Sequence, residues 1–445
     1  MMQTIRHHWE RVRTSYWFLP SLMTALAAAL ALGIVQLDEN VQEHWILELD
    51  WIYTGSAEGA RQLLATVAGS MVTVAGVVFS VTIVALSLAS NQFGPRLLRN
   101  FMRDRGNQVV LGTFIATFVY CLLVLRTVRG QDGGEFVPHI AVSGAVLLAL
   151  ASVGVLIYFI HHASVSVQAP VVIANVGREL HGSIDELFPE KLGAELDHER
   201  PQRGEGQIPA DFDAAAQPVA AKCDGYLQLV NSDKLLKVAV ANDLLLRVEH
   251  RPGHFVVRGE TLALVWPAAG NDVEEAVRET FVIGPQQTQI QDTEFVINQL
   301  VEVAVRALSP GVNDPFTAAT CVDFLAAALC RLSERKIPSP YRSDDGGRLR
   351  VIAYPLTFAN LTDSAFRQIR QHGRDSVAVI IRMLDAIALV LKHARRPEDR
   401  AALLRHALLV KQSAEDWPQE ADREDLERRY RKIIQIDNQR AQQPN

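Results

Sequence analysis

The sequence predicts a polytopic α-helical membrane protein with four transmembrane helices, followed by a cytoplasmic α+β region that joins a small β barrel-sandwich-like module to a helical bundle. Two observations support this fold class. Apolar runs dominate the first 165 of the 445 residues, whereas the remainder is charged and amphipathic. Four of these runs approach or exceed the ~20 helical residues that cross a bilayer.

The predicted transmembrane domain covers residues 1–165. The spans lie at about 17–37, 63–89, 109–125 and 137–160. Arginines precede the first span and fill the loop between the second and third, whereas the loop after the first span is mainly acidic. Because basic loops stay in the cytoplasm, we expect both termini to be cytoplasmic. A cleaved signal peptide is the alternative for the first span, but its apolar run is long and Gln36 and Asp38 follow it.

The second span carries small and hydroxylated residues on one helical face. This face, which we call the α-seam, repeats at about every seventh residue, close to two helical turns. Its members are Thr66, Gly69, Ser70, Thr73, Gly76, Ser80, Ser87 and Asn91. Lipid rewards such a face poorly, so it either packs against another helix or lines a pore.

The loop between the second and third spans is strongly basic. Its arginines are Arg96, Arg99, Arg103 and Arg105. They are expected to set topology and to contact anionic lipid headgroups. If a pore exists, the same arginines would lie at its cytoplasmic mouth and concentrate anions there.

The region after the spans divides into three parts. Residues 166–221 are an amphipathic helix and a polar linker, residues 222–268 a small β module, and residues 269–445 a helical domain. Glycine and apolar residues recur every three positions from Gly253 to Val265, a pattern that resembles biotinyl- and lipoyl-type barrel-sandwich domains. The carrier lysine between methionines is missing, so we expect a docking element without a cofactor.

A turn in the helical domain has the strongest capping signal of the chain. Asn313 and Asp314 stand before Pro315, and an aspartate followed by proline favours the start of a helix. The alternative is a polar ligand pocket or subunit contact, in which Asp292 and Arg306 of the preceding helix join this turn.

Several classes of function are excluded by composition and motifs. The net charge is −6 and no basic face is evident, so a nucleic-acid partner is not expected. The four cysteines are scattered, and no metal site, cofactor or nucleophile motif is present. None of the spans has a central charged residue, which argues against an ion-coupled transporter. We therefore expect no enzyme.

Three segments together resemble a known family. They are FSVTIVALSLASNQFGPRLLRNFMRDR, which runs from within the second span into the loop after it, IHH…VQ at the exit of the fourth, and RALSPGVNDPFTA. The resemblance is to the bacterial membrane-protein family called domain of unknown function 2254. It implies a bacterial inner-membrane location and no particular reaction.

The sequence thus favours a homo-oligomer in the lipid bilayer that acts as a passive ion channel or pore lined by the second span. The alternative is a membrane-anchored scaffold or ligand sensor, whose cytoplasmic domain binds a small molecule, an anion or a protein partner.

Overall fold

The structure is a computed structural model that describes residues 17–40, 52–97, 104–130, 136–189 and 205–441. The chain divides into two compact units, Met1–Val171 and Val172–Asn445, which we call the N-terminal and C-terminal units. Each is described separately below.

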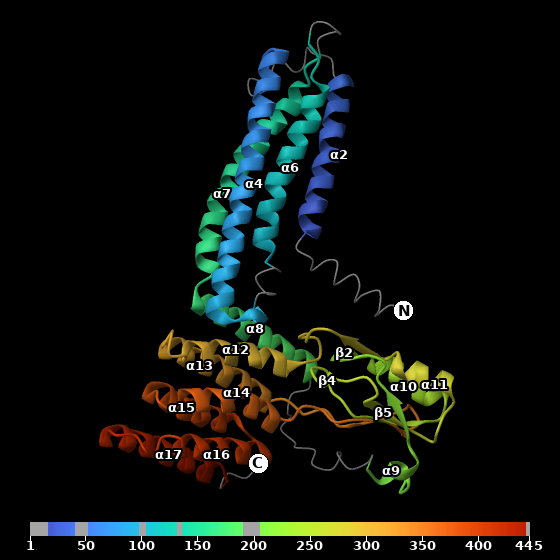
Figure 1. The fold of residues 1–445 in the computed structure, drawn as a ribbon, viewed down its shortest axis with the longest axis vertical. Helices are drawn as coiled ribbons and strands as arrows, with labels where there is room; N and C mark the ends of the chain where they lie inside the picture. Colours follow the sequence, from blue (N-terminus) through green and yellow to red (C-terminus); the bar gives the residue numbers. More distant parts are fainter. Residues whose placement is uncertain (1–16, 41–51, 98–103, 131–135, 190–204, 442–445) are drawn as a thin grey trace. The chain divides into compact units, whose positions relative to one another are not determined.

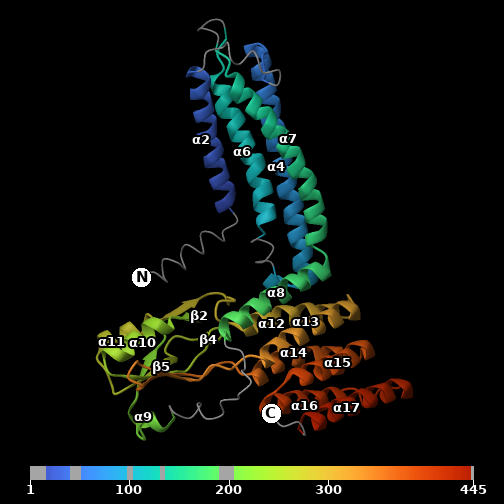
Figure 2. The ribbon, with the colours of Figure 1, turned by 180° about the vertical axis from the view of Figure 1, so that it is seen from behind.

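The N-terminal unit is a bundle of four long apolar helices. They are α2 (Phe18–Asn40), α4 (Ala57–Phe93), α6 (Arg105–Thr127) and α7 (His139–Ser166), with a 3-10 turn, η1 (Pro95–Leu97), after α4. Helix α6 is central and contacts the other three, as both ribbon views show (Figures 1 and 2). Each helix covers most of its predicted span, and α4 extends beyond the predicted 63–89 at both ends.

Polar side chains fix the ends of this bundle. The Asp38 carboxylate of α2 accepts hydrogen bonds from the backbone nitrogens of Ile140 and Ala141, at 3.0 and 2.9 Å, in the first turn of α7. At the other end of α7, His162 Nε2 lies 2.6 Å from Asp104 Oδ2, while Asp104 Oδ1 accepts the Gly106 N–H at 2.8 Å and caps α6. These carboxylates accept hydrogen bonds from amides in the first turns of α6 and α7, which have no partner within their own helices.

The C-terminal unit contains a stack of three helix pairs. The first pair is α12 (Thr293–Ala307) and α13 (Pro315–Ser333), the second α14 (Phe358–Gly373) and α15 (Val377–His393), and the third α16 (Pro397–Gln412) and α17 (Glu420–Ala441). Each pair contacts the next along the stack (Figure 1). Helix α8 (Ala169–Leu187) packs its C-terminal part on the first pair, where Gly177 meets the Phe324 ring.

The strands of this unit form two sheets. The five-stranded sheet has the order β1 (Gln217–Ala220), β5 (Thr261–Trp266), β3 (Leu245–Val248), β8 (Leu349–Ala353) and β7 (Tyr341–Ser343). The three-stranded sheet has the order β4 (Phe255–Val256), β2 (Gly225–Val230) and β6 (Phe281–Gly284). Short helices α9 (Phe212–Ala215), α10 (Ser232–Ala241) and α11 (Asn271–Arg278) accompany them, with a 3-10 turn, η3 (Glu205–Gln207).

The sheets differ from the predicted module in extent. Strands β6, β7 and β8 come from the segment 269–445, for which a helical domain was predicted, and β1 precedes residue 222. The pair β3–β8 is parallel, while the other paired strands run antiparallel. A specific barrel-sandwich fold is therefore not confirmed. The repeat at Gly253 to Val265 is local, so it indicates neither that β4 has two residues nor that β3 pairs with β8 about a hundred residues away.

Five helices of the described chain, and not four, are long and apolar enough to cross a bilayer. The fifth is α13, with a mean hydropathy of 1.4 against 2.1 to 2.5 for the other four. Half of its apolar window is buried inside the C-terminal unit. Composition alone cannot separate such a buried core helix from a span, so the count of four is not established by the fold.

Candidate functional site

The α-seam of the second span is exposed within the described bundle. Thr66, Gly69, Ser70, Thr73, Gly76, Ser80, Ser87 and Asn91 are all exposed on α4. The packed face of α4 consists of other residues, among them Ala68, Ala75 and Val78. Ala75 lies two residues after Thr73, which is about 200° around a helix. The α-seam therefore lies opposite the face that the bundle buries.

Two glycines leave two positions of the α-seam without a side chain. A Cβ built on Gly69 or on Gly76 would have no atom within 4 Å beyond its own helix. Glycine inside a helix costs about 0.5–1 kcal/mol relative to alanine, and no described atom crowds these two positions.

The hydroxyl groups of the α-seam are partly satisfied by their own helix. Thr66, Ser70 and Thr73 each donate to the carbonyl four residues earlier, at 2.7, 2.8 and 2.9 Å. These groups can therefore tolerate an apolar neighbour, and they can also exchange their partner for water.

The predicted basic loop is described only at its ends. Arg96 lies in η1 and Arg105 is the first residue of α6, and both are exposed. Arg99 and Arg103 lie outside the described residues. Between these ends, the Asp104–His162 contact joins the start of α6 to the end of α7.

The structure does not bring the predicted pocket residues of the C-terminal unit together. Asp292 precedes the first residue of α12, whereas Arg306 lies in its last turn and Asn313, Asp314 and Pro315 follow it. Asp314 caps α13: its Oδ1 accepts the backbone N–H groups of Phe316 and Thr317 at 3.1 and 3.0 Å. Asn313 adopts a left-handed conformation, with φ of 48°. The turn residues thus have helix-capping geometry at α13, whereas Asp292 caps the start of α12.

Asp292 joins the helical stack to the β module. It is 3% exposed, and its Oδ1 accepts the Phe295 N–H at 2.9 Å at the start of α12. Burial raises its pKa to about 6, against the opposing effect of that hydrogen bond. Gly253 makes this contact possible, because its φ is 96° and a Cβ there would lie 2.2 Å from Asp292 Oδ2. Any side chain at residue 253 would displace the carboxylate.

A cavity of about 590 Å³ lies next to this contact and was missed by the sequence reasoning. It opens where the parallel strands β3 and β8 end, at Val248 and Ala353. Its wall is mostly apolar, and Arg251, His254 and Arg342 also line it. The parallel pairing of segments about a hundred residues apart creates the site, and no local pattern in the sequence signals that pairing.

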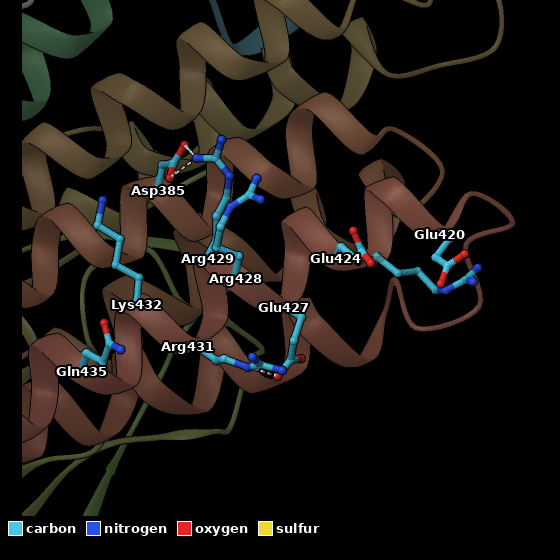
Figure 3. Close-up of a pocket in the computed structure, with 10 residues that line it drawn as sticks. Asp385, Glu420, Glu424, Glu427, Arg428, Arg429, Arg431, Lys432 and Gln435 are labelled. Atoms are coloured by element: carbon cyan, nitrogen blue, oxygen red, sulfur yellow. Dashed lines mark hydrogen bonds and ion pairs between the residues drawn. The ribbon is translucent and has the colours of Figure 1, made fainter.

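A larger hollow, of about 1140 Å³, runs along α17 and is lined by charged side chains (Figure 3). Most of its charges are paired: Arg429 with Asp385 of α15, and Arg431 with Glu427 at 3.1 Å. Ion pairs on an exposed helix face remain hydrated and contribute little to stability. The hollow therefore has the chemistry of a solvated helix face.

The comparisons with known proteins agree with a membrane protein and name no activity. Residues 13–389 match the family described as "Predicted membrane protein (DUF2254)". The chain is 34% identical over 423 residues to an uncharacterized protein of Mycobacterium bovis and to one of Mycobacterium tuberculosis, an alignment that covers 93% of this chain and 79% of each relative. No solved structure matches the chain. The chain belongs to the DUF2254 family of predicted membrane proteins.

Proposed function

We propose that the protein forms a homo-oligomer in the bacterial inner membrane, in which copies of α4 surround a passive pore. The observation that carries this proposal is the exposed α-seam, which lies opposite the packed face of its own helix. In an oligomer the seam of each copy would face a common axis. Small side chains leave that axis open, and neutral hydroxyls can solvate an ion without trapping it.

The four helices of the N-terminal unit are the spans in this proposal, and α13 is a core helix of the cytoplasmic unit. The Asp323 carboxylate of α13 forms a bidentate ion pair with Arg382 of α15, with both hydrogen bonds at 2.5 Å. An ion pair to a neighbouring helix, together with contacts to α12, α14 and α15, fits a packed bundle better than a lipid-facing helix. Basic residues at 96–105 and the acidic loop after α2 favour cytoplasmic termini.

The absence of charge from residue 63 to the end of α4 restricts the mechanism. From Leu63 to Phe93 the helix contains no Asp, Glu, Lys or Arg. Coupled transport and proton pumping generally use such residues inside the membrane. The proposal is therefore passive conduction, with any selectivity set at the arginine-rich mouth.

Cysteine accessibility separates a pore from a dry helix contact. Ser80→Cys should react with a small water-soluble thiol reagent in a membrane-embedded pore, in a Cys223→Ser background because Cys223 is exposed. Two controls flank it: Val78→Cys, on the packed face at 2% exposure, and Leu150→Cys of α7, which is 65% exposed and would face lipid. Both should stay unmodified, because a thiolate does not form away from water.

The alternative function predicts a different outcome. If the spans serve only to anchor a scaffold or ligand sensor, Ser80→Cys would be as unreactive as the two controls. Added volume at that position would then disrupt a helix contact, because buried small positions tolerate larger side chains poorly.

A further inference from the structure

The cavity beside Asp292 occupies a favourable place for a ligand. Strands β3 and β8 are parallel, with Val248 opposite Ala353 at their carboxyl ends. The chain leaves both strands there, as residues 249–252 and 354–356, and the cavity lies between these two segments. In open sheets of parallel strands, ligands bind in the crevice outside the carboxyl ends, where the loops diverge. The pair β3–β8 offers the same arrangement.

The wall of the cavity suits an apolar body. Its side chains come from the end of α8, from β2 and α10, from β3 and β8, and from the segment after β8. The apolar ones are Leu187, Phe188, Val230, Leu235, Leu236, Val248, Val351 and Leu356. A volume of about 590 Å³ lies within the range of roughly 300–1,000 Å³ that small-molecule sites occupy.

Two arginines at the cavity form no ion pair with a carboxylate among the described residues. Arg251 donates from Nη1 to the backbone carbonyl of Pro355 at 3.5 Å, and the buried Asp292 carboxylate acts on it at longer range. Arg342 donates from Nη1 to two backbone carbonyls. The contact to Ser339 is very short, and the distance to the Tyr341 carbonyl is 3.4 Å. Although Arg342 as a residue is exposed, desolvation of its guanidinium lowers its pKa.

The other charged groups at the cavity leave this positive charge in place. Glu249 pairs with Arg247 at 2.7 Å, and His250 lies 3.3 Å from Glu260. Asp233 lines the wall in the first turn of α10, and His254 is close to Arg251. The two guanidinium groups therefore keep their charge without an ion pair to a described carboxylate, although Asp292 acts on Arg251 at longer range.

We propose that this cavity binds a small anion with an apolar body, with Arg251 and Arg342 on its charged group and the apolar wall around its body. A carboxylate, sulfonate or phosphate would accept the guanidinium hydrogen bonds in the forked geometry that arginine offers. The site does not depend on the proposed pore, since it lies entirely within the C-terminal unit.

The test is calorimetric titration of the full chain in zwitterionic nanodiscs, with empty nanodiscs as the blank. The probe is naphthalene-2-sulfonate, which combines an aromatic body with an anion. Two comparison probes remove one feature each: 2-naphthalenemethanol has no charge, and sulfate has no apolar body. The naphthalene sulfonate should bind with one site per chain and at least about tenfold more tightly than either comparison probe.

Variants connect the binding to the cavity. The pair Arg251→Gln and Arg342→Gln should weaken sulfonate binding about tenfold or more, because each removes a charge-assisted hydrogen bond. Arg258→Gln is the matched control, since Arg258 is exposed on the same module and does not line the cavity. Ala353→Leu should also weaken binding by filling the crevice, and unchanged thermal unfolding midpoints would show that each variant is folded.

Three results would overturn the proposal. No binding of the sulfonate at millimolar concentration, equal binding of the neutral alcohol, or equal loss in Arg258→Gln would each contradict it. Adding phosphatidylglycerol to the nanodiscs identifies the source of the natural ligand. Competition by this lipid assigns the site to an anionic lipid, and a lack of competition assigns the site to a soluble anion.

Discussion

Replacing Asp292 with asparagine should remove a pH dependence of stability while preserving a helix cap. The Asp292 side chain is 3% exposed and caps α12 through the Phe295 N–H. Burial raises its pKa from 3.8 to about 6, and hydrogen bonds and Arg251 oppose that rise. Asparagine caps a helix about as well as aspartate, so the variant keeps the hydrogen bond without a buried charge.

The sign of the effect follows from the direction of the shift. Because the folded pKa of Asp292 lies above the unfolded value of 3.8, the folded protein holds this proton more tightly. The stabilisation is fully present below pH 3.8 and is lost as pH rises through about 6. A shift of about two units is roughly 3 kcal/mol, so the wild type should lose about that much relative to Asp292→Asn between about pH 4 and pH 7.

A matched control is available at the next helix. Asp314 also caps a helix, but hydrogen bonds from the side chain and backbone of Thr317 lower its pKa. Its contribution is present above the unfolded pKa and is lost as pH falls through the lower folded value. The wild type should therefore gain stability relative to Asp314→Asn as pH rises from the acid end, the opposite slope to Asp292→Asn.

The assay is the thermal unfolding midpoint of the full-length protein in detergent, recorded at several pH values for the wild type and the two asparagine variants. The difference between wild type and variant isolates one carboxylate from the many others that titrate. Parallel curves for wild type and Asp292→Asn, or slopes of the same sign for both variants, would refute the argument from burial.

Three further predictions follow from other contacts. Asp314→Ala should lower stability by ~1 kcal/mol at neutral pH, because the first amides of α13 lose their acceptor; an unchanged unfolding midpoint would show that the cap is dispensable. Gly177→Ala should be less stable than the matched Gly182→Ala by about 1–3 kcal/mol, since a Cβ at 177 would lie 2.3 Å from the Phe324 ring and one at 182 meets nothing; equal midpoints would contradict this packing. Cysteine labelling in intact cells should modify residue 43 from outside and leave residue 99 unmodified, and labelling of residue 99 would reverse the proposed orientation.

The sequence predicts the elements whose cause is local. Apolar length places the four N-terminal helices, and Asp314 before Pro315 places the start of α13. The seven-residue repeat also predicts which side of α4 carries small residues, and the structure places those residues away from the bundle. The residues that determine each of these features lie within a few helical turns of one another.

Features that depend on distant partners could not be predicted in this way. The cavity exists because Val248 pairs with Ala353, and neither the strand nor its flanking residues reveal that partner. Helix α13 is long and apolar enough to be a fifth candidate span, and its contacts, such as the ion pair between Asp323 and Arg382, depend on a partner about 60 residues away. The pocket hypothesis joins Asp292, on the preceding helix, to the turn at Asp314, but the length of α12 separates them.

The most direct test of the proposed pore is ion flux through purified protein in liposomes, comparing the wild type with Ser80→Leu and with Leu150→Ala. Ser80 lies on the exposed α-seam and Leu150 on an exposed, bulky face of α7. The account predicts flux in the wild type and in Leu150→Ala, and loss of flux in Ser80→Leu with the oligomer intact. A monomeric protein, or a wild type that conducts neither cations nor anions, would contradict it.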